Sequence, residues 1–113
     1  MISRHLVAEI RAPFSVLDDA PNLVTALIDA SSRAGATVLN YMHHRFDPQG
    51  VTAMVMLAES HTTIHTFPEL GKAQFDAFTC GEAASPQRLF EIFCEIIGID
   101  PKSQNWSQLQ RDV

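Results

Sequence analysis

Residues 51–79 read VTAMVMLAESHTTIHTFPELGKAQFDAFT, and this stretch decides the fold. Its first part, 51–58, is apolar on both alternating faces, and 61–66 and 73–79 have the length and composition of two further strands. Between these two, the Pro-Glu-Leu-Gly sequence at 68–71 has the residues of a turn. We therefore predict three consecutive strands.

Two more strands are predicted on the N-terminal side of this stretch. Residues 36–45 suit a strand, and the Asp-Pro-Gln-Gly sequence at 47–50 has the residue types that a tight turn requires. Residues 4–10 suit a first strand, because apolar side chains alternate there with others.

Two helices complete the predicted elements. The first follows Asp18-Asp19-Ala20-Pro21, has an apolar stripe at spacings of three and four, and ends at Gly35. The second begins after Ser85-Pro86, an N-cap followed by proline in the first helical position, and ends at Gly98 and Pro101. The tail to Val113 is polar, with Trp106 as a possible anchor.

The order β-α-β-β-β-β-α predicts an α+β fold, a two-layer α/β sandwich with a largely antiparallel sheet and both helices on one face. The second face of strand 51–58 would then leave Met54 and Met56 in water. Another surface is expected to cover them, and a homodimer with its two sheets face to face would do so.

Composition fits one soluble domain. The chain has 113 residues, of which 46% are hydrophobic and 19% are charged, and no apolar run is long enough to cross a bilayer. Residues 1–5 lack a basic region followed by an apolar stretch, so no secretory signal is predicted and a cytoplasmic location is expected. The net charge of -5, without a Lys/Arg cluster, argues against nucleic-acid binding.

Reactive groups are concentrated in residues 57–69 and 78–81. These segments hold a Glu-Ser bond, two histidines, a carboxylate and a thiol. The two cysteines, Cys80 and Cys94, are too few for a disulfide framework, so free thiols are expected. The spacing of His61 and His65 relative to His43-His44 matches no standard zinc pattern, so no metal site is predicted.

The run from Ala58 to Glu69, AESHTTIHTFPE, followed by Phe-Thr-Cys-Gly at 78–81, closely resembles the active-site region of the prokaryotic S-adenosylmethionine decarboxylases. These are pyruvoyl-dependent enzymes. Phe67 stands where the family pattern has tryptophan. Residues 35–38 and 44–51 also resemble the family, so the similarity covers most of 3–81.

This resemblance implies self-cleavage between Glu59 and Ser60. The serine hydroxyl would attack the Glu59 carbonyl to form an ester, β-elimination would release the upstream chain, and hydrolysis would leave a pyruvoyl group at residue 60. The products would be a β chain of 1–59 and an α chain of 60–113. The pyruvoyl ketone would form an imine with the substrate amine and accept the electron pair left by CO2, for spermidine biosynthesis. The family also implies an αββα homodimer with active sites near the subunit boundary.

The resemblance assigns roles to six further residues. His65 would act as a base in maturation, and its type suits proton transfer near neutral pH. Cys80 would donate a proton to the decarboxylated carbon. Phe46 and Phe67 would stack on adenine, and Glu69 would bind the ribose hydroxyls. Thr52 falls where many members carry a serine that assists processing.

Two alternatives stay open. Residues 70–74 depart from the family pattern, so a pyruvoyl-dependent decarboxylase of arginine or ornithine is one of them. The other is an uncleaved, non-catalytic paralogue that binds a ligand or pairs with an active subunit.

Overall fold

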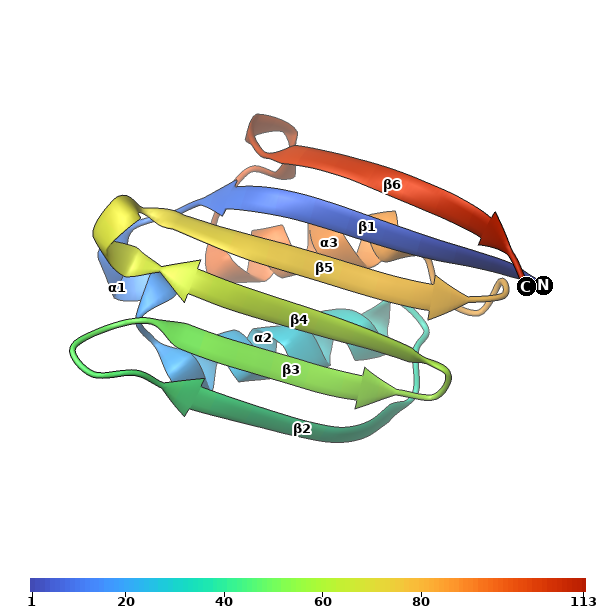
Figure 1. The fold of residues 1–113 in the computed structure, drawn as a ribbon, viewed down its shortest axis with the longest axis horizontal. Helices are drawn as coiled ribbons and strands as arrows, with labels where there is room; N and C mark the ends of the chain where they lie inside the picture. The colour runs from blue at the N-terminus through green and yellow to red at the C-terminus, as the bar shows by residue number, and fades with distance from the viewer.

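The computed structural model describes residues 1–113 and has one six-stranded sheet (Figure 1). The strands lie in the order β2-β3-β4-β5-β1-β6, and every neighbouring pair is antiparallel. Their bounds are β1 Ile2–Arg11, β2 Val38–Arg45, β3 Val51–Leu57, β4 Ser60–Phe67, β5 Lys72–Cys80 and β6 Asn105–Asp112. The antiparallel sheet predicted from the sequence is confirmed.

The two long helices lie behind one face of this sheet, as Figure 1 shows. They are α2 (Ala20–Arg33) and α3 (Pro86–Ile97), and a side chain caps the N-terminus of each, at α3 the predicted Ser85. The Asp19 side chain accepts from the Asn22 amide at 3.2 Å, and the Ser85 hydroxyl accepts from the Arg88 amide at 3.3 Å. The remaining helical segments are short: α1 (Phe14–Leu17), η1 (Pro68–Leu70) and η2 (Pro101–Ser103).

Gly35 ends α2 as predicted. Its φ is +97°, and a Cβ at this position would lie 2.5 Å from the carbonyl oxygen of Ala83. Only glycine fits there without a shift of backbone. The close approach holds the end of α2 against the segment that links β5 to α3.

The core lies between the sheet and the two long helices. On β5, Ala73, Phe75 and Ala77 alternate inward, and the Phe75 ring lies 5.3 Å and 5.2 Å from the rings of Phe90 and Phe93. Cys94 is fully buried in the same core. Burial, followed by the nearby carboxylates of Asp100, Glu91 and Glu95, raises the pKa of its thiol to about 12. A thiol buried in this way is unreactive at neutral pH.

The other face of the sheet has no helix over it. Met42, Met54 and Met56 lie on this open face of β2 and β3 and are all exposed, as expected for the second side of strand 51–58. None of the helices has the length and apolar character that a membrane crossing requires.

The prediction of five strands was wrong at the C-terminus, where the polar tail forms the sixth strand, β6. All eight of its residues are exposed, so no alternation of apolar residues marks it in the sequence. It pairs along its length with β1, from Ile2 opposite Asp112 to Glu9 opposite Asn105, and is held by backbone hydrogen bonds. Trp106 lies on this edge strand and is 40% exposed, so it does not anchor the tail in the core.

Candidate active site

Glu59 and Ser60 lie at the tight turn between β3 and β4. Leu57 pairs with Ser60, so the turn has only two residues between its paired ends. The Ala58 amide donates to the Thr37 carbonyl at 2.9 Å, which ties the turn to the segment before β2. Glu59 has a φ of 60° and is the only non-glycine residue with a positive φ. Residues other than glycine rarely adopt a positive φ, so the backbone is strained beside the Glu59–Ser60 bond.

Cys80 lies at the same end of the sheet as this turn. His61 pairs with Phe78, and continuing that register by two residues puts Cys80 opposite Glu59. The thiol is half-buried, in contrast to that of Cys94. Next to it, the hydroxyl of Thr79 is the one buried side-chain polar atom without a hydrogen-bond partner. The Glu59–Ser60 bond and a half-buried thiol therefore lie in one small region.

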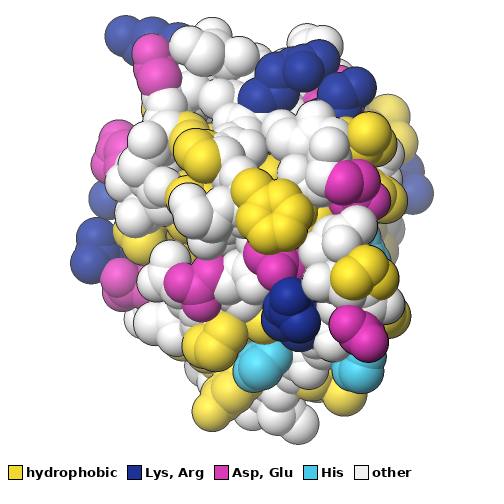
Figure 2. All heavy atoms as spheres, turned by 90° about the vertical axis from the view of Figure 1, so that its left-hand side faces the viewer, with side chains coloured by type: hydrophobic (Ala, Val, Ile, Leu, Met, Phe, Trp, Pro, Cys, Tyr) yellow, Lys and Arg dark blue, Asp and Glu magenta, His cyan; other side chains and the backbone are white.

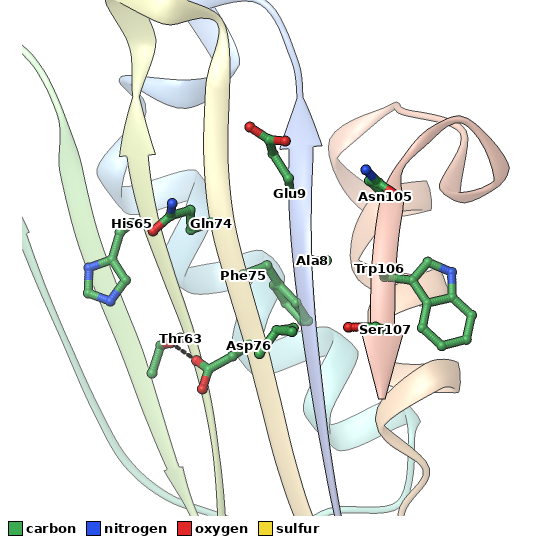
Figure 3. A pocket seen from close by; sticks show the side chains of 11 residues that line it. Ala8, Glu9, Thr63, His65, Gln74, Phe75, Asp76, Asn105, Trp106 and Ser107 are labelled. Carbon is green, nitrogen blue, oxygen red and sulfur yellow. Dashed lines mark hydrogen bonds between the residues drawn. The ribbon is translucent and has the colours of Figure 1, made fainter. Parts of the chain in front are cut away.

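His65 lies on the open face, farther along β4. Its Nδ1 is 3.1 Å from the Thr52 hydroxyl. The two residues to which the family resemblance gives roles in maturation are therefore in contact. His65 also lines a wide, shallow hollow of about 750 Å³, with Glu9, Gln74 and Asp76 along the neighbouring strands (Figure 3). Imidazole in such a position can exchange protons with a group brought to this face.

Phe46, Phe67 and Glu69 lie at the opposite end of the sheet from Ser60, as the ends of β2, β4 and η1 in Figure 1 show. Phe46 is 47% exposed and Phe67 is 39% exposed, so both rings are available to a flat ligand. Figure 2 shows this end of the molecule, where hydrophobic side chains lie among acidic, basic and histidine side chains. The arrangement offers stacking faces and carboxylates together.

A clamp around Asp18, which the sequence did not single out, fixes the loop that carries Phe46. One Asp18 oxygen accepts from the Gly50 amide at 2.9 Å, and the other accepts from Arg45 Nε and Nη2 at 3.1 and 2.7 Å. The Gly50 amide, followed by the Arg45 guanidinium, lowers the pKa of this carboxyl below its ordinary value. Arg45 also donates to the Pro48 carbonyl at 3.1 Å. Phe46 thus lies in a loop between the anchored residues Arg45 and Gly50, and its own amide donates to the Gly50 carbonyl at 2.8 Å.

A second missed group lies on the open face, where His5 of β1 and Asp76 of β5 adjoin His61 of β4. The three residues are far apart in the sequence. Only the register of three strands brings them together, so no local spacing could have indicated them.

The candidate residues thus form two groups at opposite ends of one sheet. Glu59, Ser60 and Cys80 make one group. The other holds the remaining candidates, His65, Thr52, Phe46, Phe67 and Glu69. Each group contains only some of the residues that the family resemblance assigns to one active site.

Comparison with known proteins connects this arrangement to one family. The family model described as S-adenosylmethionine decarboxylase matches residues 4–112. The chain belongs to the S-adenosylmethionine decarboxylase family. Proenzymes of this family form a pyruvoyl group by autocatalytic cleavage.

Relatives in this family span nearly the same length as the chain. It is 43% identical to the S-adenosylmethionine decarboxylase proenzyme of Prochlorococcus marinus, over 100% of this chain and 90% of that protein. The corresponding Bacillus cereus proenzyme 1 is 40% identical over 97% of this chain and 84% of its own length.

A crystal structure of the adenosylmethionine decarboxylase from Aquifex aeolicus has the same fold as this member of the family. Its TM-score is 0.86, with 26% sequence identity over 99% of this chain and 92% of that one. The six-stranded sheet and the helices behind it are therefore the architecture of the family.

Proposed function

We propose that this chain is a pyruvoyl-dependent S-adenosylmethionine decarboxylase that matures by cutting itself between Glu59 and Ser60. The observation that carries the proposal is the Glu-Ser bond at a strained turn, in a chain that matches the family model over residues 4–112. The relatives' names favour S-adenosylmethionine over arginine or ornithine and over an uncleaved paralogue. The product would serve as an aminopropyl donor in spermidine biosynthesis.

The turn suits the formation of a pyruvoyl group. Ser60 provides a hydroxyl that serves first as nucleophile and then as leaving group, and Glu59 provides the carbonyl that is attacked. A non-glycine residue in the left-handed region costs on the order of 1–3 kcal/mol, part of which is released when the Glu59–Ser60 bond breaks. The pyruvoyl group would supply an electron sink for the carbanion left when CO2 departs.

A single chain does not bring His65 to the bond it would act on. Ser60 and His65 are five residues apart on one extended strand, a distance of about 17 Å. Proton transfer needs a separation of about 3 Å between heavy atoms. Phe46, Phe67 and Glu69 are separated from Ser60 in the same way, so the site requires a second source of these residues.

We infer that a second copy of the chain provides them. Two open faces packed around a two-fold axis, with their strands running in opposite senses, would bring the Ser60 end of one copy to the His65 end of the other. The same packing would cover Met42, Met54 and Met56, which are 63%, 37% and 57% exposed in one chain. The result is the αββα homodimer, with two composite active sites.

In each composite site, Ser60 and Cys80 come from one copy. His65 of the other copy would take the proton in the elimination step, oriented by the hydroxyl of Thr52. Phe46 and Phe67 would stack on adenine, and the Glu69 carboxylate would hold the ribose hydroxyls. Cys80 would give its proton to the carbon that loses CO2.

A cytoplasmic location stays a prediction.

The test is the intact mass of the purified protein, together with release of CO2 from each candidate substrate. We expect two fragments, 1–59 and 60–113, the second capped by a group that hydrazine or borohydride traps. Ser60→Ala is expected to stay whole and inactive, and Ser103→Ala, a serine remote from the turn, is the control that cleaves. A whole wild-type chain, or turnover of arginine or ornithine but not of S-adenosylmethionine, would contradict the proposal.

A further inference from the structure

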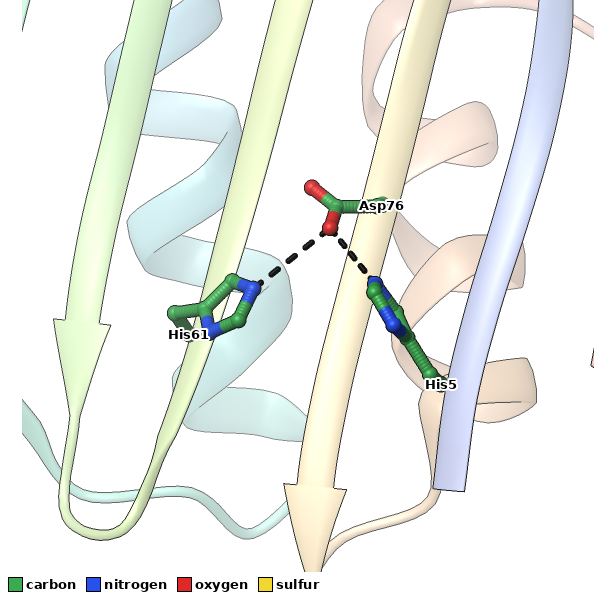
Figure 4. Close-up of side chains that lie close together, drawn as sticks. All are labelled: His5, His61 and Asp76. Atoms are coloured by element: carbon green, nitrogen blue, oxygen red, sulfur yellow. Dashed lines mark hydrogen bonds and ion pairs between the residues drawn. The ribbon is translucent and has the colours of Figure 1, made fainter. Parts of the chain in front are cut away.

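Three side chains on the open face point at one another from adjacent strands (Figure 4). His5 Nε2 lies 2.7 Å from Asp76 Oδ2, and His61 Nε2 lies 3.4 Å from the same oxygen. The three atoms all lie within 4.8 Å of one another. The residues are 25–44% exposed, so the group is open to solvent in one chain but is set into the sheet surface.

These nitrogen–oxygen distances are similar to the distances between neighbouring ligand atoms around a bound metal ion. With metal–ligand bonds of about 2.0–2.1 Å, neighbouring ligand atoms are about 3.4 Å apart around a tetrahedral ion and about 2.9 Å apart around an octahedral one. The distances from Asp76 Oδ2 to the two histidine nitrogens, 2.7 and 3.4 Å, lie near these values. The separation between the two histidine nitrogens, at most 4.8 Å, would have to shorten when an ion binds.

The surroundings hold all three groups in orientation. The Thr63 hydroxyl donates to Asp76 Oδ1, the oxygen that the histidines leave free. The His61 ring stacks on Phe78 with centroids 5.5 Å apart, and His5 meets the same ring edge-on at 5.7 Å. Outer hydrogen bonds and packing of this kind are typical of metal ligands.

Asp76 is the one carboxylate of the group, and three side chains surround it. Burial alone would raise the pKa of its carboxyl, but hydrogen bonds from His61, Thr63 and His5 outweigh burial and hold the pKa well below its ordinary value.

We propose that His5, His61 and Asp76 form a binding site for one divalent transition-metal ion such as Zn²⁺ or Co²⁺. Two imidazole nitrogens and one carboxylate favour these ions over Mg²⁺ or Ca²⁺, which prefer oxygen ligands. This site replaces the prediction of no metal site, and it does not depend on the proposed decarboxylation.

The test is calorimetric titration of chelator-treated protein with ZnCl2 and CoCl2, supported by the visible spectrum of the cobalt form. We expect one ion per chain. His61→Gln should weaken binding at least about tenfold, and Thr63→Val, which leaves all three ligands in place, should weaken it about 10- to 100-fold. The matched control is His43→Gln, a histidine opposite Ala53 on the other side of the sheet, which should bind as the wild type does.

Thermal unfolding without metal shows whether each variant folds, and Zn²⁺ should then raise the Tm of the wild type but not that of His61→Gln. Absence of saturable binding would overturn the proposal and leave a hydrogen-bonded cluster held by protons alone. Equal affinity in His61→Gln and His43→Gln would also overturn it.

Discussion

Mixing two inactive variants, Ser60→Ala and His65→Ala, should restore cleavage. In one chain these residues are about 17 Å apart along β4, so each variant alone lacks one half of every composite site. In a mixed dimer, one site receives Ser60 from one copy and His65 from the other, and the second site receives two alanines. One site in each mixed dimer is therefore complete.

A composite site fixes the fraction of chains that are cleaved. When two variants are expressed at equal levels and pair at random, about half of the dimers are mixed. Only the His65→Ala chain of each mixed dimer can be cut, so about one chain in four should be cleaved. A site contained within one chain predicts no cleavage at all.

The assay is co-expression of differently tagged variants, followed by intact mass of each chain. The matched control is the double variant Ser60→Ala/His65→Ala co-expressed with the wild type, whose mixed dimers have no complete site. In that pairing, about half of the wild-type chains should remain whole. Full cleavage of the wild type there, together with none in the first mixture, would refute the composite site.

Three further outcomes are expected. Asp18→Asn should raise the KM for the substrate ~fivefold and leave cleavage unchanged, because the loop that carries Phe46 then spends less time in its binding position. The control is Asp29→Asn, which removes an exposed ion pair on α2. Alkylation of the native protein should modify Cys80 and spare the fully buried Cys94 until the protein unfolds, and equal rates by mass spectrometry would contradict the packing. Phe75→Ala should lower the free energy of unfolding by about 3–5 kcal/mol in urea titrations, since its ring is buried against two others, and a loss below ~1 kcal/mol would count against that core.

Local pattern predicted most of the fold. The strands within 51–79 were predicted because 51–58 is apolar on both alternating faces and 61–66 and 73–79 have the length and composition of strands. The long helices were predicted from the acidic residues and proline at 18–21, from Ser85-Pro86, and from Gly35 at the end of the first. These signals arise from contacts between residues near in sequence, so one chain is enough to detect them. The β6 strand has no such signal, because its side chains are exposed and only its backbone pairs with β1.

The sequence predicted which residues belong to the candidate site, but not how they are arranged in space. The motif from Glu59 to Cys80 named the reactive groups, and the strand predicted at 61–66 already separates Ser60 from His65, but neither shows at which end of the sheet Phe46 or Cys80 lies. The Asp18 clamp and the pairing of His5 with Asp76 join distant segments, so they depend on the register of the whole sheet. Contacts of this kind become visible only when the strands are assembled.

The strand order has a consequence for the protein after cleavage. Fragment 1–59 would contribute β1, β2 and β3, and fragment 60–113 would contribute β4, β5 and β6. In the sheet, β1 of the first fragment lies between β5 and β6 of the second, while β3 borders β4. The two pieces are thus interleaved and stay associated through three shared ladders after the covalent link is lost. Unfolding of the nicked protein becomes a dissociation, so its melting temperature should rise with protein concentration.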